Sequence, residues 1–403
     1  MFEESILKKI LDTWSFDQNH PHRDRRKKPL PSITDLRVLI ETCFLASLKR
    51  EEGKSLTFSV VLLPQNKIEE ELKTSGRKQL ILKFDKSLPF VESSIVKLAS
   101  AFDPKISSLI VGHLERNNNE YEIWGVMFFR PSHSRFNEIS AGILEFSYFR
   151  PDVMMVTVVS PGSLTISRGD IRIGHFTAGT FTAATPTPFA SRAMGSYIID
   201  CIKEDEGYKK YQNLYWQIFS ASIEYLLSEA STRGHGGTLI MFPERMREEC
   251  RKKYIEKYPF NHNLEIEKII LELLNLPTRN IAPFDILLNR LLSERLSFLG
   301  QLSCIDGALI LTSNLNSISF GTKLRSEEWI GKVILGPDGF NSRGEELSTA
   351  HFGTRHSSAL NFVGNFYGVI GFVISQDGPI RGFVKKDDNT IFCWPDCGIS
   401  MFI

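Results

Sequence analysis

Short apolar runs that end at turn residues constrain the fold of this chain most. Residues 56–63 and 238–242 are uninterrupted runs rich in apolar and β-branched residues, and Pro243 stops the second. Runs of this length and composition are typical of strands buried in a sheet. Residues 211–229 and 264–276 instead carry apolar residues three and four apart, the spacing of an amphipathic helix. The sequence therefore predicts a mixed α/β protein.

The same two patterns recur along the rest of the chain. Further strands are expected at residues 109–113, 121–129, 308–312, 317–321 and 368–375, and a hairpin is expected to join 143–149 to 153–159. Further helices are expected at residues 1–14, 36–48, 284–298 and 354–362. Residues 334–347 hold several glycines and polar residues and are expected to form a loop.

The length of the chain predicts two domains, since 403 residues exceed what one hydrophobic core usually organises. We expect an N-terminal α/β domain over residues 1–245, a helical connector over 246–282, and a C-terminal domain with a mixed sheet and flanking helices over 283–403. Residues 160–174 weakly resemble residues 306–321 in their strand-turn-strand pattern. The N-terminal domain is therefore either a degenerate relative of the C-terminal domain or an unrelated domain with a common pattern.

Charge and apolar content exclude some classes of partner. The 48 basic and 47 acidic residues nearly cancel, so we expect neither nucleic acid nor a membrane as a partner. No apolar run approaches the roughly 20 residues that span a bilayer, and residues 1–14 resemble an amphipathic helix rather than a signal peptide. The six cysteines show no zinc-site spacing, so reduced thiols and a cytoplasmic location are expected.

Two short motifs in the C-terminal region carry chemistry. An Asp-Gly-Ala at residues 306–308 opens a predicted strand, and a Gly-Thr-Arg-His at residues 353–356 opens a predicted helix. A carboxylate can hold a divalent cation, while a helix start with an arginine and a histidine offers N–H groups and positive charge to phosphates. Each motif alone has a simpler explanation: a turn for Asp-Gly and a surface ion pair for Arg-His. Together in one small domain they point to a nucleoside triphosphate site.

The order strand, loop, helix, strand with these motifs resembles the diadenylate cyclase (DAC) domain family, from residue 284 to residue 381. The matching segments are residues 306–310, 318–324, 353–359 and 368–377. Families with this domain often carry an N-terminal sensor-type domain, and residues 46–53 with 236–243 are similar to such a region. The resemblance implies a DAC domain over 283–403 and a sensor or regulatory role for the N-terminal domain over 1–245. Such a domain condenses two ATP into cyclic di-AMP and two pyrophosphates where two subunits meet face to face.

The resemblance also implies roles for individual residues. Asp306 would hold Mg²⁺ or Mn²⁺, with Asp377 as a second metal ligand, and Arg355 and His356 would act in catalysis by gripping the triphosphate. The other residues implied to bind the nucleotide are Gly307, Ala308, Leu324, Gly353, Thr354, Ser357 and Ser375. Leu324 would line the adenine pocket. ATP is thus the expected substrate, and a homodimer or higher homo-oligomer is the expected assembly.

The sequence departs from the family pattern in three segments. Its Arg-His-Arg ends here in Ser357, its Ser-Glu-Glu reads Ser-Gln-Asp at residues 375–377, and Ile305 stands where some members have histidine. One cation near the triphosphate is therefore missing, and Lys323 or Arg325 could replace it. The alternative hypotheses are a catalytically weak or inactive nucleotide-binding regulatory module on the DAC fold, and an assembly protein whose C-terminal domain is a structural relic.

Overall fold

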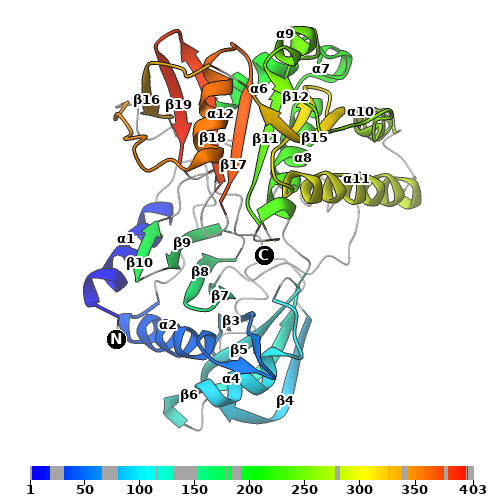
Figure 1. The fold of residues 1–403 in the computed structure, drawn as a ribbon. Helices are drawn as coiled ribbons and strands as arrows, with labels where there is room; N and C mark the ends of the chain where they lie inside the picture. Colours follow the sequence, from blue (N-terminus) through cyan, green and yellow to red (C-terminus); the bar gives the residue numbers. More distant parts are fainter. Residues whose placement is uncertain are drawn as a thin grey trace. The chain divides into compact units, whose positions relative to one another are not determined.

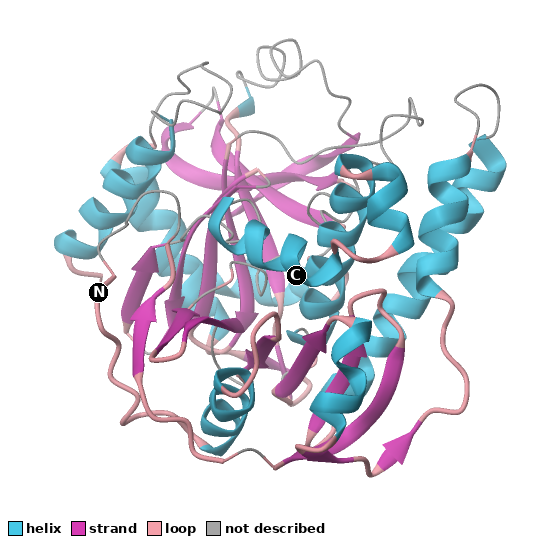
Figure 2. Cartoon of the chain, turned by 90° about the horizontal axis from the view of Figure 1, so that it is seen from above, coloured by secondary structure: helices cyan, strands magenta, loops and turns pink. Residues whose placement is uncertain are grey.

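The computed structural model describes residues 2–18, 31–65, 80–104, 106–114, 117–129, 153–169, 171–177, 179–183, 192–231, 233, 235–276, 282–325, 327–337, 344–375, 380–395 and 397. The chain forms two compact units, the first with elements α1 to β10 and the second with elements α6 to β19. Figure 1 traces both units, and Figure 2 shows helices alongside the strands. The predicted mixed α/β class is confirmed.

An eight-stranded sheet forms the centre of the first unit, in the order β10-β9-β8-β7-β3-β5-β6-β4. β3 runs parallel to β5, and the other neighbours are antiparallel. The strands are β3 (Phe58–Leu62), β4 (Leu80–Pro89), β5 (Ser107–Leu114), β6 (Asn117–Phe128), β7 (Met154–Ser160), β8 (Ser163–Arg168), β9 (Ile171–Thr177) and β10 (Thr180–Ala183). The helices are α1 (Glu4–Gln18), α2 (Ile33–Ser47) and α4 (Glu92–Ala99), and β1 (Arg50–Glu51) pairs with β2 (Lys54–Ser55) as a separate hairpin.

The helix α2 shows how local sequence builds this unit. The Ser32 hydroxyl accepts a hydrogen bond from the Asp35 backbone N–H at 3.0 Å, and the Ser32 N–H donates to the Asp35 carboxylate at 3.2 Å. This reciprocal cap fixes the start of the helix. Leu36, Leu39 and Cys43 follow at helical spacing and are fully buried in the core of the first unit. Burial of each large side chain stabilises the fold by about 1.5–3 kcal/mol.

The second unit is built on a nine-stranded sheet in the order β12-β15-β14-β11-β17-β18-β19-β16, with β13 also paired to β15. The strands are β11 (Gly237–Phe242), β12 (Tyr254–Ile255), β13 (Tyr258–Pro259), β14 (Ala308–Thr312), β15 (Ser317–Leu324), β16 (Lys332–Leu335), β17 (Ile370–Ile374), β18 (Ile380–Asp387) and β19 (Thr390–Trp394). The helices are α6 (Arg192–Ile202), α7 (Glu206–Tyr211), α8 (Asn213–Ser231), α9 (Arg247–Arg251), α10 (Ile266–Asn275), α11 (Ala282–Ser303) and α12 (Thr354–Gly364), and a 3₁₀ turn η2 spans Glu244–Met246.

Helices cover both faces of this second sheet. On one face α12 lies over β17 and β18 (Figure 1), and its Phe362 packs with Ile240 of β11. On the other face α8 and α11 pack together, and Leu292 shares a cluster with Leu239. Successive strand residues point to opposite faces, so the uninterrupted apolar sequence of β11 reflects burial on both sides. The central strand therefore has no solvent-exposed face.

Most of the predicted elements lie where the sequence places them. β14 spans the predicted residues 308–312, and α12 begins at the predicted residue 354 and continues two residues beyond 362. The first strand of the predicted 143–159 hairpin lies outside the described residues, and the second is β7. The loop prediction for 334–347 is wrong at its start, where β16 pairs in parallel with β19.

The predicted domain boundaries differ from those of the two compact units. β11 falls within the predicted N-terminal domain, yet it pairs with β14 on one side and β17 on the other. A boundary at residue 245 would separate this strand from both hydrogen-bonded neighbours. α10 lies in the predicted connector, yet Ile266 and Ile270 are fully buried with α8 and α11. The second unit therefore includes the elements from α6 onward.

The two segments that resemble each other in the sequence, residues 160–174 and 306–321, lie in different units and different sheets. In each unit the strand-turn-strand pattern is an antiparallel pair, β8 with β9 and β14 with β15. Such pairs are common in mixed sheets, so the shared pattern has a local explanation.

Hydropathy gives no sign of a membrane-spanning helix. Within the described part of the chain, every helix is either too short or too polar to cross a bilayer.

Candidate functional site

The register of the second sheet brings the two sequence motifs to one edge. Thr238 of β11 lies opposite Ala308 of β14 and Val373 of β17, and Val373 lies opposite Arg381 of β18. These four residues form one row across the sheet, and paired residues in a row point to the same face. Asp306 lies two residues before Ala308 of this row, at the edge where β11, β14 and β18 begin and β17 ends.

Glycines at this edge are required by close packing of the backbone. Gly307 has a φ of 109°, and a Cβ there would lie 2.4 Å from the carbonyl carbon of Gly321 on β15. Gly321 has a φ of 61°, also in the region that favours glycine. The sequence predicts that Gly307 lets the backbone come close to a nucleotide. Its packing against β15 is a second reason for a glycine at this position.

The Gly-Thr-Arg-His motif forms the start of α12. Gly353 is the N-cap and provides no side-chain hydrogen bond to the first turn, and Thr354 is exposed. The first N–H groups of a helix lack intrahelical partners, and the helix dipole places partial positive charge there. This helix start can therefore accept an anion. Arg355, His356 and Ser357 are half-buried in the same turn.

Arg381 joins this helix start from the neighbouring strand. Its Nη1 lies 3.0 Å from Nε2 of His356, and its guanidinium carbon lies 5.4 Å from the centre of the Phe352 ring. Burial lowers the pKa of His356 to about 4, with further lowering by Arg381 and Arg355. The imidazole is therefore neutral near pH 7, and its Nε2 accepts the hydrogen bond from Arg381.

The Cys304 thiol links the two motifs electrostatically. Burial raises the pKa of this thiol, while Arg233 and Arg355 act in the opposite direction. Arg355 on α12 is thus close enough to influence a residue two positions before Asp306.

Charged side chains at this edge differ from those elsewhere in the second unit. Three arginines here have no carboxylate partner among the described residues: Arg233, Arg355 and Arg381. Three arginines that follow the other end of β11 each pair with a glutamate: Arg245 with Glu204, Arg247 with Glu244 and Arg251 with Glu256. Cations without acidic partners, beside a free helix start, suit a polyphosphate.

Asp306 is the carboxylate best placed to serve a cation at this edge. Its side chain is exposed, and no described residue forms a hydrogen bond or ion pair with it. Asp377, the second predicted metal ligand, and Gln376 lie outside the described residues. Within the described part, no group of three His, Cys, Asp or Glu side chains could hold a metal. Nucleotide sites bind Mg²⁺ through one or two carboxylates plus phosphate oxygens, so Asp306 fits that chemistry.

The remaining predicted residues have mixed placements. Leu324 is half-buried at the end of β15 and packs in the cluster on the α12 face. Ser375 is half-buried directly after β17. The two suggested replacement cations do not reach α12 through any contact among the described residues: the Arg325 backbone N–H donates to Lys253, and Lys323 pairs with Ile255 of β12.

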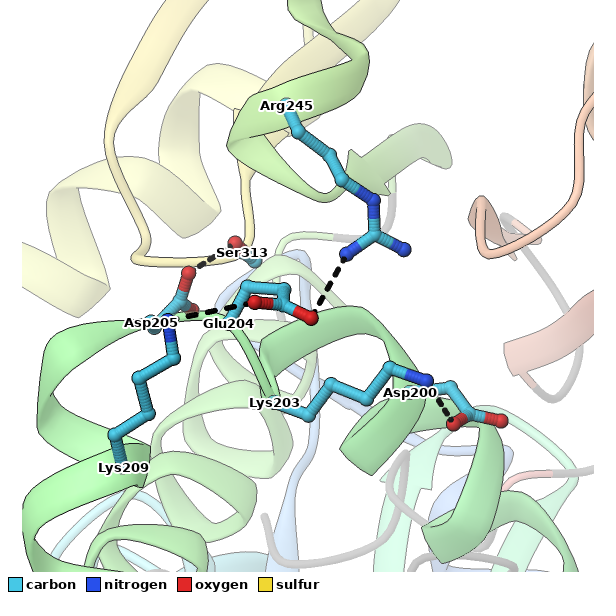
Figure 3. Close-up of polar contacts among 7 residues, drawn as sticks. All are labelled: Asp200, Lys203, Glu204, Asp205, Lys209, Arg245 and Ser313. Atoms are coloured by element: carbon cyan, nitrogen blue, oxygen red, sulfur yellow. Dashed lines mark hydrogen bonds and ion pairs between the residues drawn. The ribbon is translucent and has the colours of Figure 1, made fainter.

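A cavity of about 570 Å³ lies near the opposite end of β11. Its lining residues are Glu244, Arg245, Arg247, Glu248, Arg251, Glu256, Pro259, Phe260 and Ile318. Figure 3 shows the adjacent polar network, in which Glu204 faces both Lys209 and Arg245 and the Ser313 hydroxyl donates to Asp205 at 2.8 Å. Charges around this cavity are largely paired, so it offers less free charge to a ligand than the motif-bearing edge.

Arg381 is the residue that sequence reasoning missed. The available signal is weak: an arginine in an otherwise apolar strand, between Ile380 and the buried residues from Gly382 to Val384. Which helix a strand arginine faces depends on the strand register. Local sequence does not supply that register.

Comparisons with known proteins bear first on the N-terminal region. The family model described as "Probable sensor domain DACNV" matches residues 25–128. The matched segment is similar to the sensor domain that this family model describes. Its described part contains α2, α4 and the strands from β1 to β6. The match confirms the predicted N-terminal sensor-type domain. It covers the predicted similarity at residues 46–53, whereas the second segment named for that similarity, 236–243, lies beyond it and forms β11.

Two further comparisons add little. A double mutant of DacA from Staphylococcus aureus is a solved structure with 14% sequence identity, covering 47% of this chain and 92% of that chain at a TM-score of 0.23. A TM-score this low does not establish a shared arrangement of elements. No curated protein matches the chain.

Proposed function

We propose that the second unit is a diadenylate cyclase and that the N-terminal sensor-type domain regulates it. The cyclase would condense two ATP molecules into cyclic di-AMP and two pyrophosphates. The proposal is supported by the register of the second sheet, in which Asp306 lies two residues before the row that contains Arg381, and by the hydrogen bond from Arg381 to His356 of α12. The resemblance of these motifs to the DAC family supplies the reaction, and the DACNV match supports the domain combination.

The start of α12 is the proposed triphosphate site. Arg355 and the first N–H groups of the helix would spread the phosphate charge, and Thr354, exposed in the same turn, can donate a hydroxyl hydrogen bond. His356 is neutral near pH 7, so it orients neighbouring groups rather than adding charge. Positioning and charge neutralisation dominate phosphoryl chemistry, and alignment alone can lower a barrier by about 7–11 kcal/mol.

Asp306 is the proposed ligand for Mg²⁺ or Mn²⁺, with Asp377 as the second carboxylate. A divalent cation bound there would supply positive charge beside the α-phosphate and the attacking hydroxyl. The 3′-oxygen of one nucleotide forms the new bond to the α-phosphorus of the other, and the bond to the pyrophosphate oxygen breaks. The hydroxyl proton leaves to solvent or a base. Two such transfers close the ring, so the proposal requires two copies of the chain to face each other.

A second candidate function is a regulatory module that binds ATP without turnover. Ser357, in place of the family's second arginine, favours it, because losing one charged contact to phosphate weakens binding or rate by about one to two decades. Both functions use the same edge of the sheet.

Incubation of the full chain with ATP and either Mg²⁺ or Mn²⁺, followed by mass spectrometry, separates the two functions. A cyclic di-AMP peak and released pyrophosphate support the cyclase. ATP binding by calorimetry with no product, at protein concentrations high enough to dimerise, supports the module instead. Absence of both binding and product contradicts both. The mass spectrum also reveals any mixed cyclic dinucleotide.

A further inference from the structure

Arg381 is a half-buried cation on strand β18 of the second sheet. It lies in the row with Ala308, Thr238 and Val373, and its side chain is half-buried on the face that α12 covers. A guanidinium taken partly out of water is costly unless an anion or several hydrogen bonds compensate. Among the described residues no carboxylate provides that compensation.

Two neutral groups hold the Arg381 guanidinium in place. Nε2 of His356 accepts one hydrogen bond at 3.0 Å, and the ring of Phe352 lies 5.4 Å from the guanidinium carbon. The Phe352 and His356 rings are themselves 5.4 Å apart, so the three side chains form one cluster at the start of α12. Arginine has five N–H donors, and His356 uses one. Among the described residues, the other donors have no hydrogen-bond partner.

We propose that Arg381 is a phosphate-binding residue of this site and acts with Arg355 on the β- and γ-phosphates of the bound nucleotide. This inference rests on the proposed nucleotide function. The planar guanidinium fork matches phosphate oxygens in a bidentate way, and Phe352 and His356 orient the fork before the ligand arrives. The site thereby recovers from β18 the cation that is absent from position 357 of α12.

A structural role for Arg381 would have different consequences. If the side chain only packs against Phe352 and His356, its replacement lowers stability and affects all nucleotides alike. A phosphate-binding role instead depends on the number of phosphates in the ligand. AMP lacks the β- and γ-phosphates and serves as the internal comparison.

Calorimetric titration of the full chain with ATP and with AMP, both with Mg²⁺, tests the role. For Arg381→Gln we expect the Kd for ATP to rise about ten- to a hundredfold, since a charged hydrogen bond to phosphate is lost. The Kd for AMP should change far less. Arg381→Lys should recover part of the ATP affinity, because it restores the charge without the fork. Thermal unfolding of each variant reports its folding.

Two further variants sharpen the comparison. Arg290→Gln removes an exposed arginine of α11 that bonds only to Glu294, at 2.8 Å, and should leave both affinities unchanged. Ser357→Arg added to Arg381→Gln places a guanidinium in the first turn of α12, next to His356, and should recover ATP affinity. A merely structural Arg381 would not be rescued in this way.

The outcomes separate this inference from the proposed cyclase. Unchanged ATP affinity in folded Arg381→Gln, or equal losses for ATP and AMP, overturns the role of Arg381 and leaves the cyclase standing. A selective loss of ATP affinity in a protein that makes no cyclic di-AMP supports Arg381 and overturns the cyclase. A wild-type chain that binds no ATP overturns both.

Discussion

Asp306 and Gly307 are neighbours in the sequence, yet different forces act on them. Asp306 is exposed and has no partner among the described residues, so its carboxylate contributes little to folding. Gly307 packs its backbone against Gly321 in a conformation that favours glycine. A substitution at Asp306 should therefore test the proposed function, and a substitution at the adjacent Gly307 should test the folding of the sheet.

Replacement of Asp306 by asparagine tests the metal ligand. The amide keeps the shape but loses the charge that would hold Mg²⁺ or Mn²⁺, so we expect cyclic di-AMP formation to fall at least about a hundredfold. The unfolding temperature should stay at the wild-type value. Asp200→Asn, which removes an exposed carboxylate bonded to Lys203, is the matched control. Full activity in the Asp306 variant would show that the metal assignment is wrong.

Replacement of Gly307 by alanine tests the close approach of β14 and β15. The added Cβ would meet the Gly321 backbone at 2.4 Å with φ at 109°, so we expect the free energy of unfolding to fall by about 1–3 kcal/mol. Gly353→Ala is the control, because no atom lies within 4 Å of its Cβ position and its φ is −71°. Urea denaturation compares the two. Equal stabilities would contradict the packing at Gly307.

At the scale of elements, the sequence of each segment specifies whether it forms a helix or a strand. The pairing of neighbouring strands decides which side chains of those elements lie together at the edge of the sheet. α12 begins at Thr354, directly after the N-cap Gly353, and its apolar side chains Ala359 and Phe362 pack against the sheet. Because of that packing, the first turn of α12 lies at the edge of the sheet where β14 begins. The pairing of β17 with β18 then adds Arg381 to the same edge.

The N-cap of α2 offers a test at this scale within the sensor-type domain. Ser32→Ala removes the hydroxyl that bonds the Asp35 N–H at 3.0 Å, and we expect a loss of about 1 kcal/mol in the free energy of unfolding. Ser93→Ala, at an exposed position in α4, should change stability little. Chemical denaturation of both variants gives the comparison, and equal values would argue against the capping box.

At the scale of the whole molecule, the two compact units follow the packing of the strands and differ from the boundary predicted at residue 245. β11 is at the centre of the second sheet although sixty-five residues separate it from β14, as numbered from Phe242 to Ala308. The helices between these strands, α10 and α11, bury their apolar stripes on α8. A fragment of the second unit therefore needs all of these elements.

Fragments test this division directly. A fragment of residues 185–403 contains every strand of the second sheet and should fold cooperatively, whereas residues 246–403 lack β11 and α8 and should not. Circular dichroism and thermal unfolding of the two fragments provide the measurement. A cooperative transition in the shorter fragment would contradict the compact units.

Two half-buried acids should make the stability of the second unit depend on pH. Burial raises the pKa of Asp205 to about 6 and that of Glu267 to about 7, and for Glu267 the nearby Asp205 adds to the rise. The folded state therefore holds these protons to higher pH than the unfolded chain does. The contribution of these acids is complete below their unfolded values of 3.8 and 4.5 and is lost as pH rises through 6 and 7.

Glu267→Gln removes one of these two titrations. Relative to this variant, we expect the wild-type chain to lose unfolding free energy between pH 5 and pH 8. Glu272→Gln, an exposed change on the same helix, should follow the wild-type profile. Urea denaturation across that pH range is the measurement. Parallel profiles for wild type and Glu267→Gln would contradict the buried position of this acid.

Sequence reasoning reached the α/β class, the main strands, the sensor-type domain and the two motifs. Each of these depends on short-range patterns: the run of apolar residues in β11, the helical spacing in α2, and the residue types around Asp306 and Arg355. Such patterns are local, because the periodicity of a segment reflects the geometry of its own backbone. The sequence did not predict the role of Arg381, the boundary between the two units, or the packing of Gly307 against Gly321.

Those three features depend on contacts between residues far apart in the chain. Strand order and register decide that β11 joins β14 and that Arg381 meets His356, and only the complete sheet defines them. By itself, the amino-acid sequence determined which segments become helices and strands and which residues can bind phosphate or a cation. Tertiary structure decided which of those residues meet, because register and packing arise only when distant segments are buried together.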